Sequence, residues 1–193
     1  MPVKNNESTK TVVQGRLSYA HVFKPYAGIA GQEEKYSTTI LIPKKDVATK
    51  ASIDAAIAEA ERKGISEKWE GIKPPVVPNP LWDGDGVKSD GSEFGAECKG
   101  HWVLTASAKA DYPPQVVNQR VEPIMNQSEI YSGVWANVAI NFFPYKFAGK
   151  KGVGAGLGNI QKVKDGESLA GTRTAQQDFK PVAVASAEDE DFM

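Results

Sequence analysis

Proline and glycine interrupt this sequence so often that a helical bundle is excluded. The 193 residues include 12 Pro and 18 Gly, and both residue types mark turns and loops. The stretches between them show mainly strand-like patterns. The sequence therefore predicts a mainly β protein with many turns.

The expected strands show alternating apolar residues or a high content of β-branched residues. In the first, residues 11–24, the expected core face consists of odd positions: Val13, Leu17, Tyr19 and Phe23. The other expected strands span residues 35–42, 101–110, 131–146 and 159–164. In residues 131–146 the even positions are uniformly apolar, which indicates one buried face.

One helix is expected, over residues 46–63. Asp46 is a suitable N-cap, the interior is rich in Ala, and Gly64 is a natural stop. The expected buried side of this helix carries Val47, Ala51, Ile53, Ile57 and Ala60. A single helix among strands favours a small barrel of the OB type over a sandwich.

Residues 71–100 are irregular and rich in Pro, Asp and Gly. We expect them to wrap the barrel as a long loop, because apolar residues within them can anchor it: Val76, Val77, Leu81, Trp82 and Phe94. The expected organisation is a flexible N-terminus (1–9), an OB-fold-like domain (10–169) and a disordered acidic tail (170–193).

Composition excludes several classes of protein. Apolar runs such as residues 134–140 are far shorter than the ~20 residues of a membrane span. The N-terminal residues contain no hydrophobic signal region, so we expect a cytoplasmic protein. One Cys and two His exclude a disulfide framework and an ordinary zinc site. No cofactor is expected.

Charge is distributed unevenly. Residues 130–164 contain no Asp or Glu but carry Lys146, Lys150, Lys151, Lys162 and Lys164, whereas residues 188–191 are all acidic. This asymmetry favours a face that binds a polyanion and a tail that competes for it. A solvated lysine surface with a solubilising tail remains the alternative.

The odd positions of residues 131–146 carry aromatic and amide side chains: Tyr131, Trp135, Asn137, Asn141, Phe143 and Tyr145. Rings beside lysines suit single-stranded nucleic acid, because bases stack on rings while Lys holds phosphates. The alternative is that these aromatics pack beneath the long loop or form a subunit interface.

Two further motifs are less specific. The acidic residues Asp83, Asp85, Asp90 and Glu93 lack EF-hand spacing, but Asp83 and Asp85 leave a metal-dependent nuclease as an alternative function. The glycine-rich run 149–158 lacks the P-loop ending and the Rossmann pattern. It is interpreted either as a flexible basic loop that approaches phosphates or as a plain hairpin turn.

Several blocks, spread over residues 10–170, resemble a bacteriophage family. They are RLSYAHVFKP (16–25), KYSTTILIPK (35–44), LWDGD (81–85), PQVV (114–117), YSG (131–133) and KGVGAGLGNIQKV (151–163). The chain is similar to the Enc34-type phage single-stranded DNA-binding proteins. The resemblance implies an OB-fold that coats single-stranded DNA without sequence preference during phage replication or recombination, in the host cytoplasm.

The resemblance extends to the acidic C-terminus, which is similar to tails that recruit replication partners. Such tails usually end on Phe, whereas Met193 follows Phe192 here. The expected partner-binding residues are Glu188, Asp189, Glu190, Asp191 and Phe192.

The sequence thus predicts a non-enzymatic protein whose partner is single-stranded DNA, with replication or recombination proteins as further partners. Homo-oligomer formation is left open. The expected stacking residues are Tyr131, Trp135, Phe143 and Tyr145. The expected phosphate contacts are Arg16, Lys109, Lys146, Lys150 and Lys151. No catalytic residue and no metal ligand is expected.

Overall fold

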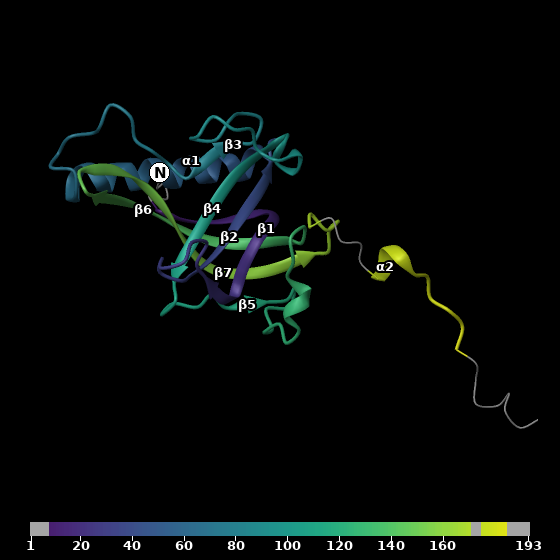
Figure 1. The fold of residues 1–193 in the computed structure, drawn as a ribbon. Coiled ribbons are helices and arrows are strands. Elements are labelled where there is room, and N and C mark those ends of the chain that lie inside the picture. The colour runs from purple at the N-terminus through teal and green to yellow at the C-terminus, as the bar shows by residue number, and fades with distance from the viewer. Residues whose placement is uncertain (1–7, 171–174, 185–193) are drawn as a thin grey trace, which may run out of the picture.

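A computed structural model describes residues 8–170 and 175–184 of the chain. The strands are β1 (Lys10–Tyr26), β2 (Lys35–Pro43), β3 (Leu81–Asp83), β4 (His101–Lys109), β5 (Val116–Val117), β6 (Trp135–Phe147) and β7 (Lys150–Lys164). The helices are α1 (Val47–Glu67) and the short α2 (Ala175–Asp178), with 3₁₀ turns at Ala96–Cys98 and Gln127–Glu129. Figure 1 shows the strands wrapped into a barrel, with α1 across one end.

Five strands close the barrel in the order β4-β2-β1-β6-β7. The neighbours pair antiparallel except for β4 and β7, which meet in parallel where Ser107 lies opposite Gly156. Strands β3 and β5 add to the edges of β4 and β7. This closed five-stranded barrel confirms the expected OB-type fold.

The barrel interior is filled by alternate side chains of these strands, including Val13, Leu17, Ile40, Leu104 and Val138, all fully buried. On β6 every expected core position is buried: Ala136, Val138, Ile140 and Phe142, with Val134 just before the strand. Helix α1 contributes Ile53, Ala56, Ile57 and Ala60 to the same core. The apolar alternation therefore positions β6 with its odd residues outward.

Helix α1 begins as expected but ends later. The Asp46 side chain accepts a hydrogen bond from the Thr49 N–H, which makes it the N-cap. Gly64 does not end the helix but lies buried within it. The Trp69 ring packs against Gly64, where a side chain of residue 64 would otherwise stand. The expectation that Val47 and Ala51 are buried is wrong, since the inward stripe begins at Ile53.

Tyr19 is a second correction. It was expected in the core, but it has a φ of 49° and is 71% exposed. The register between β1 and β2 shifts between Ser18 and His21, so that Val22 takes the inward position instead. A bulge of this kind moves every following side chain to the other face.

Two expected strand boundaries in the β6–β7 hairpin are wrong. Strand β6 starts at Trp135, so Tyr131 precedes the strand rather than lying on its odd face. Strand β7 starts at Lys150, nine residues earlier than expected, with Ala148 and Gly149 at positive φ in the turn. The glycine-rich run is therefore mostly strand, so both the flexible-loop and the plain-turn interpretations of residues 149–158 are wrong, and only Gly149 belongs to the turn of the hairpin.

The long loop wraps the barrel as expected, but not through every anchor. Val77 and Leu81 pack against the main core, and Phe94 packs on a small outer cluster of Leu41, Cys98 and Val103. Val76, in contrast, is 78% exposed. Among the residues that the structure describes, no helix is both long and apolar enough to cross a membrane.

Candidate nucleic-acid interface

The odd residues of β6 form a continuous outer face with their neighbours on β1 and β7. Trp135 pairs with Arg16 and Lys164, Asn137 with Gln14 and Gln161, and Asn141 with Lys10 and Gly156. Further along, Phe143 pairs with Gly154, Tyr145 with Gly152 and Phe147 with Lys150. The structure thus brings Trp135, Phe143 and Tyr145 onto one face, as the alternation predicts.

At the hairpin end, rings cover glycines. A β-carbon built on Gly154 would lie 2.6 Å from Cζ of Phe143, and one on Gly152 would lie 2.5 Å from the Tyr145 hydroxyl oxygen. Phe143 remains 41% exposed, whereas Tyr145 is half-buried. Because no side chain stands at these glycines, the rings rest on the backbone of β7, and Phe143 stays exposed to solvent.

At the other end, Trp135 is held between two cations. The Arg16 guanidinium carbon is 6.0 Å from the ring centre and the Lys164 ammonium is 5.2 Å from it. Arg16 also donates hydrogen bonds from Nε to the Gly133 carbonyl (3.3 Å) and from Nη2 to the Glu167 carbonyl. Arg16, expected to contact phosphate, is therefore engaged with backbone in this structure.

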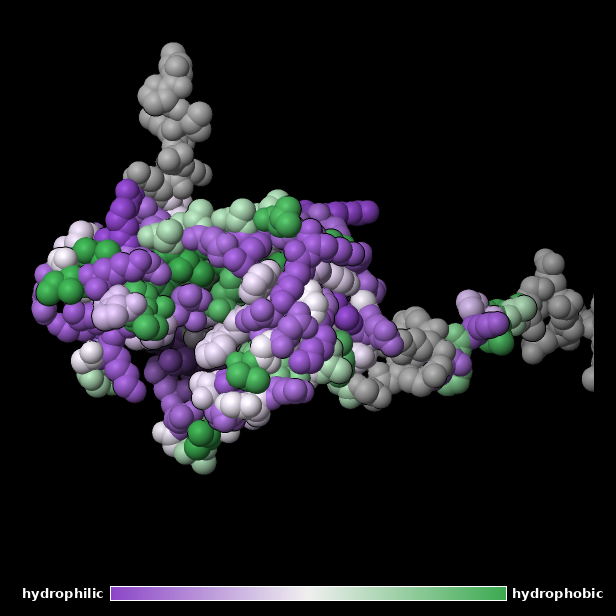
Figure 2. Space-filling view, turned by 90° about the horizontal axis from the view of Figure 1, so that it is seen from above, coloured by the Kyte–Doolittle hydropathy of each residue, from purple (hydrophilic) through white to green (hydrophobic). Residues whose placement is uncertain are grey.

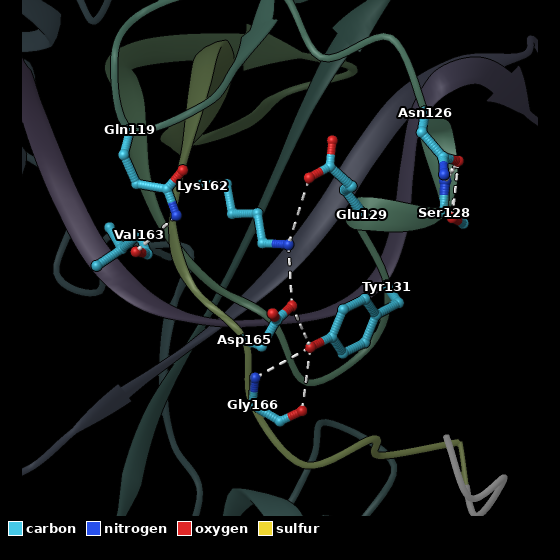
Figure 3. A network of polar contacts seen from close by, with 9 residues as sticks. All are labelled: Gln119, Asn126, Ser128, Glu129, Tyr131, Lys162, Val163, Asp165 and Gly166. Atoms are coloured by element: carbon cyan, nitrogen blue, oxygen red, sulfur yellow. Dashed lines mark hydrogen bonds and ion pairs between the residues drawn. The ribbon is translucent and has the colours of Figure 1, made fainter. Parts of the chain in front are cut away.

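Tyr131 belongs to a polar network beside this end of the face (Figure 3). Its hydroxyl donates to Asp165 (2.9 Å) and accepts from the Gly166 N–H (3.0 Å), while the buried Lys162 ammonium lies 2.9 Å from Asp165 and 3.9 Å from Glu129. Burial raises the pKa of the Tyr131 hydroxyl, and the hydrogen bond from Lys162 lowers the pKa of Asp165. Tyr131 thus joins the chain before β6 to the chain after β7.

The expected cations fall into two groups. Lys146 is paired with Glu70, whose pKa this hydrogen bond lowers, and the Lys151 ammonium donates to the Trp69 carbonyl (3.4 Å). Lys109 and Lys150 are exposed, and neither has an acidic partner within residues 8–170 or 175–184. Lys109 and Lys150 are therefore the phosphate-binding candidates that are held by neither a carboxylate nor a backbone carbonyl.

An open groove of about 700 Å³ runs across the same outer surface. Its walls come from four strands: residues 10–12 of β1, 107–109 of β4, 139–141 of β6 and 156–159 of β7, together with Tyr112. Lys10 and Lys109 line it, and no Asp or Glu does. The groove joins the expected Lys109 to the Phe143 end of the face, since Phe143 Cδ1 lies 3.9 Å from where a β-carbon of Gly156 would be.

Sequence reasoning missed three residues at this surface. Phe147 is 79% exposed and is the next odd position of β6, one residue beyond the predicted end of the strand. Tyr112, 72% exposed, and Lys10 lie just outside predicted strands, and only the folded barrel brings them to the groove. Seen from above, the molecule shows hydrophobic patches among hydrophilic side chains (Figure 2).

The carboxylates of Asp83 and Asp85 are paired with a lysine. The Lys44 ammonium lies 2.6 Å from Asp83 and 2.7 Å from Asp85, and its hydrogen bonds lower the pKa of both carboxyls. Asp85 also accepts from the Gly100 N–H, which ties the loop to β4. In the described part of the chain, no group of three or more His, Cys, Asp or Glu is placed to hold a metal ion. The expected tail residues Glu188–Phe192 lie outside the described residues.

Residues 9–193 match the family model described as the single-stranded DNA-binding protein of Enterobacter phage Enc34. The chain belongs to this family. The Enc34 single-stranded DNA-binding protein solved in complex with single-stranded DNA is 32% identical, with a TM-score of 0.67 over 83% of this chain and 88% of that chain. A second structure of the bacteriophage Enc34 single-stranded DNA-binding protein is 31% identical, with a TM-score of 0.65 over 88% of this chain and 87% of that chain.

A more distant structure shares the fold of the Enc34 family. It is gp2.5, a single-stranded DNA-binding protein encoded by bacteriophage T7, which is 17% identical with a TM-score of 0.57 over 86% of this chain and 97% of that chain. No curated protein matches the chain. The family resemblance expected from the sequence blocks is thus confirmed.

Proposed function

We propose that this protein binds single-stranded DNA without sequence specificity during phage DNA replication or recombination. The observation that carries the proposal is its membership of the Enc34 family together with a hairpin face that carries both an exposed ring, Phe143, and an unpaired lysine, Lys150. Residues 10–169 form the binding domain, and residues 170–193 form an acidic tail.

The proposed interface uses stacking and phosphate contacts together. Bases stack on Phe143 and Tyr145, which are already held flat against β7, so little side-chain freedom is lost on binding. Lys109 and Lys150 bind phosphates and release the counterions condensed on the strand. This binding makes and breaks no covalent bond, so the proposed function is not an enzymatic one.

Some residues of the proposed interface already have a partner within the protein, and they contact DNA by exchanging that partner for the nucleic acid. Trp135 offers a base its ring when Lys164 moves from that ring to a phosphate, and Tyr131 and Arg16 keep the surrounding chain in place. Lys146 and Lys151 lie beside the hairpin and turn from Glu70 and the Trp69 carbonyl towards the polyanion. These contributions are smaller than those of Phe143 and Lys109, because an existing contact is lost each time.

The acidic tail is proposed to compete with DNA and to recruit replication or recombination proteins. Glu188, Asp189, Glu190 and Asp191 carry four negative charges, followed by Phe192. A tail of this charge, tethered to the binding domain, opposes the phosphate backbone at a high effective concentration.

The experiment that tests the function is a titration of labelled single-stranded oligonucleotide and of the matching duplex at two salt concentrations. Tighter binding of the single strand, weakened by salt, is expected. Magnesium-dependent loss of the labelled strand would favour a nuclease, and a stable oligomer that binds neither nucleic acid would favour the aromatic face as a subunit interface.

A further inference from the structure

The outer half of the β6–β7 hairpin is a two-stranded ribbon. In the described chain, β1 pairs with β6 only as far as Asn141, and β4 meets β7 only at Gly156. Positions 143–147 and 150–154 pair with each other and, within the described residues, with no third strand. Figure 1 shows this part of the hairpin beside α1. The ribbon therefore extends past the closed part of the barrel.

The core fixes the ribbon from one side. Trp69, which follows α1, is fully buried, and its Nε1–H donates to the Tyr145 carbonyl (3.0 Å). Val153 of β7 is buried in the same hydrophobic cluster as Trp69. The opposite side of the ribbon carries the rings of Phe143, Tyr145 and Phe147, which occupy every second position of β6. These rings therefore lie on a support that the core holds in place.

Phe147 is the last ring of this row and differs from the others. Phe143 covers Gly154, where no side chain competes with the ring, whereas Phe147 lies opposite Lys150. Because Lys150 has a side chain, the Phe147 ring has no bare backbone to rest on. Phe147 is accordingly 79% exposed, against 41% for Phe143. The row of covered glycines thus ends at a ring that projects into solvent.

The turn of the hairpin fixes the position of this ring. Ala148 (φ 49°) and Gly149 (φ 78°) both have positive φ, as in the two-residue turns whose twist matches that of a hairpin. Such a turn sets the register, and it places Phe147 opposite Lys150. Lys150 is exposed and has no acidic partner within the described residues. The tip therefore presents an aromatic ring and an unpaired cation side by side.

We propose that Phe147 acts as a wedge that opens the end of a duplex adjoining the bound single strand. The inference rests on the proposed function, in which bases stack on Phe143 and Tyr145. A strand that follows this row of rings reaches Phe147 next, so a duplex that continues the strand meets the projecting ring. Apolar side chains inserted at a base step unstack it. The released base stacks on Phe147 while Lys150 holds its phosphate, which offsets the cost of breaking the pair.

The test measures how fast one strand leaves a short duplex that carries a single-stranded overhang. The full chain is added until the overhang is saturated, as judged by fluorescence anisotropy, so that differences in affinity do not affect the rate. A fluorophore and a quencher at the far end of the duplex report release, and excess unlabelled strand prevents rebinding. Overhangs of both polarities are used, because the direction of the bound strand decides which duplex end meets Phe147.

Two variants and one control separate the wedge from binding alone. Phe147→Ser removes the ring at an exposed position, so the fold should be retained, and Phe147→Tyr keeps a ring. The matched control is Met125→Ser, which removes an apolar side chain that is 91% exposed and lies outside the hairpin.

With an overhang of one polarity, the wild type should release the strand faster than it leaves without protein. Phe147→Ser should slow this release about fivefold, as expected for the loss of one stacked base. Phe147→Tyr should stay within about twofold of the wild type because it keeps the stacking ring, and Met125→Ser should match the wild type. Release at the wild-type rate by Phe147→Ser, or no acceleration by a wild type that saturates the overhang, overturns the wedge while the proposed function stands. A wild type that does not bind the overhang rejects both.

Discussion

The ring of Phe143 on β6 lies directly over Gly154 on β7, where a β-carbon would come within 2.6 Å of the ring. The same arrangement recurs one rung further on, between Tyr145 and Gly152. Glycine weakens an isolated strand, but a ring from the neighbouring strand covers the exposed backbone and restores packing. The hairpin therefore holds two rings flat before any ligand arrives.

Phe143→Ala should weaken the binding of single-stranded DNA by about 1–3 kcal/mol, the contribution of one stacked base. The measurement is fluorescence anisotropy with a labelled oligonucleotide. Trp82→Ala is the matched control, because Trp82 on β3 is 42% exposed and Phe143 is 41% exposed. A greater loss of affinity in Trp82→Ala than in Phe143→Ala would move the interface to the β3 side of the barrel.

The double variant Lys109→Gln/Lys150→Gln should reduce the salt dependence of binding. Each phosphate contact on a single strand contributes about −0.7 to the slope of log Kobs against log salt, so the slope should become less steep by about 1.4. Lys45→Gln/Lys63→Gln changes the net charge equally at exposed sites that are not part of the β6–β7 face. The assignment of Lys109 and Lys150 fails if both double variants change the slope by the same amount.

Gly133→Ala should destabilise the fold. Gly133 has a φ of 118°, and a β-carbon there would lie 2.1 Å from the Glu167 carbonyl oxygen. The backbone conformation alone costs a residue with a side chain about 1–3 kcal/mol, and the clash adds to it. Denaturant unfolding should show this loss, whereas Gly28→Ala, with its nearest neighbour at 4.0 Å, should change stability by less than about 0.5 kcal/mol. Equal stability of the two variants would show that the close approach of Gly133 to Glu167 leaves room for a side chain.

Acid should weaken the contact between Lys44 and the 83–85 loop. The hydrogen bonds from Lys44 lower the pKa of Asp83 and Asp85, so their contribution to stability is present above the unfolded value of about 3.9 and is lost as pH falls through the lower folded values. Lys44→Met should therefore be less stable than the wild type at neutral pH, and the difference should shrink below about pH 4. Unfolding followed at both pH values checks this, and a constant difference would contradict it.

Truncation before Glu188 should tighten DNA binding, most strongly at low salt, because it removes four negative charges that oppose the phosphates. The comparison is between the full chain and the truncated chain in the same titration. A neutralised tail, with Gln and Asn at residues 188–191, should behave like the truncation. Equal or weaker binding by both altered chains would reject competition by the tail.

The sequence predicted what depends on local alternation and missed what depends on register between strands. The buried residues of β6 follow a strict two-residue period, so both faces of that strand could be read directly. Tyr19 was misplaced because a register shift against β2 reverses the faces after Ser18. No local pattern in residues 11–24 signals that shift.

The glycine-rich strand and the groove were missed for different physical reasons. Glycine has a low strand propensity, so the alternation of Gly with Val153, Ala155 and Leu157 did not predict a strand. In the structure, the rings of β6 cover these glycines. The groove exists only because β4 and β7 separate beyond Ser107. Its residues come from four strands, and only the barrel topology shows that Lys10 and Lys109 line the same groove.

Photocrosslinking shows whether single-stranded DNA lies on the outer face of the β6–β7 hairpin. The full chain is irradiated with an oligonucleotide that carries 5-iododeoxyuridine, and the crosslinked peptides are identified by mass spectrometry. We expect crosslinks at aromatic residues of this face, most of all at Phe143 and also at Tyr112, Tyr145 and Trp135. Crosslinks confined to Trp82 on β3 and the neighbouring Phe94 would instead place the DNA outside this hairpin.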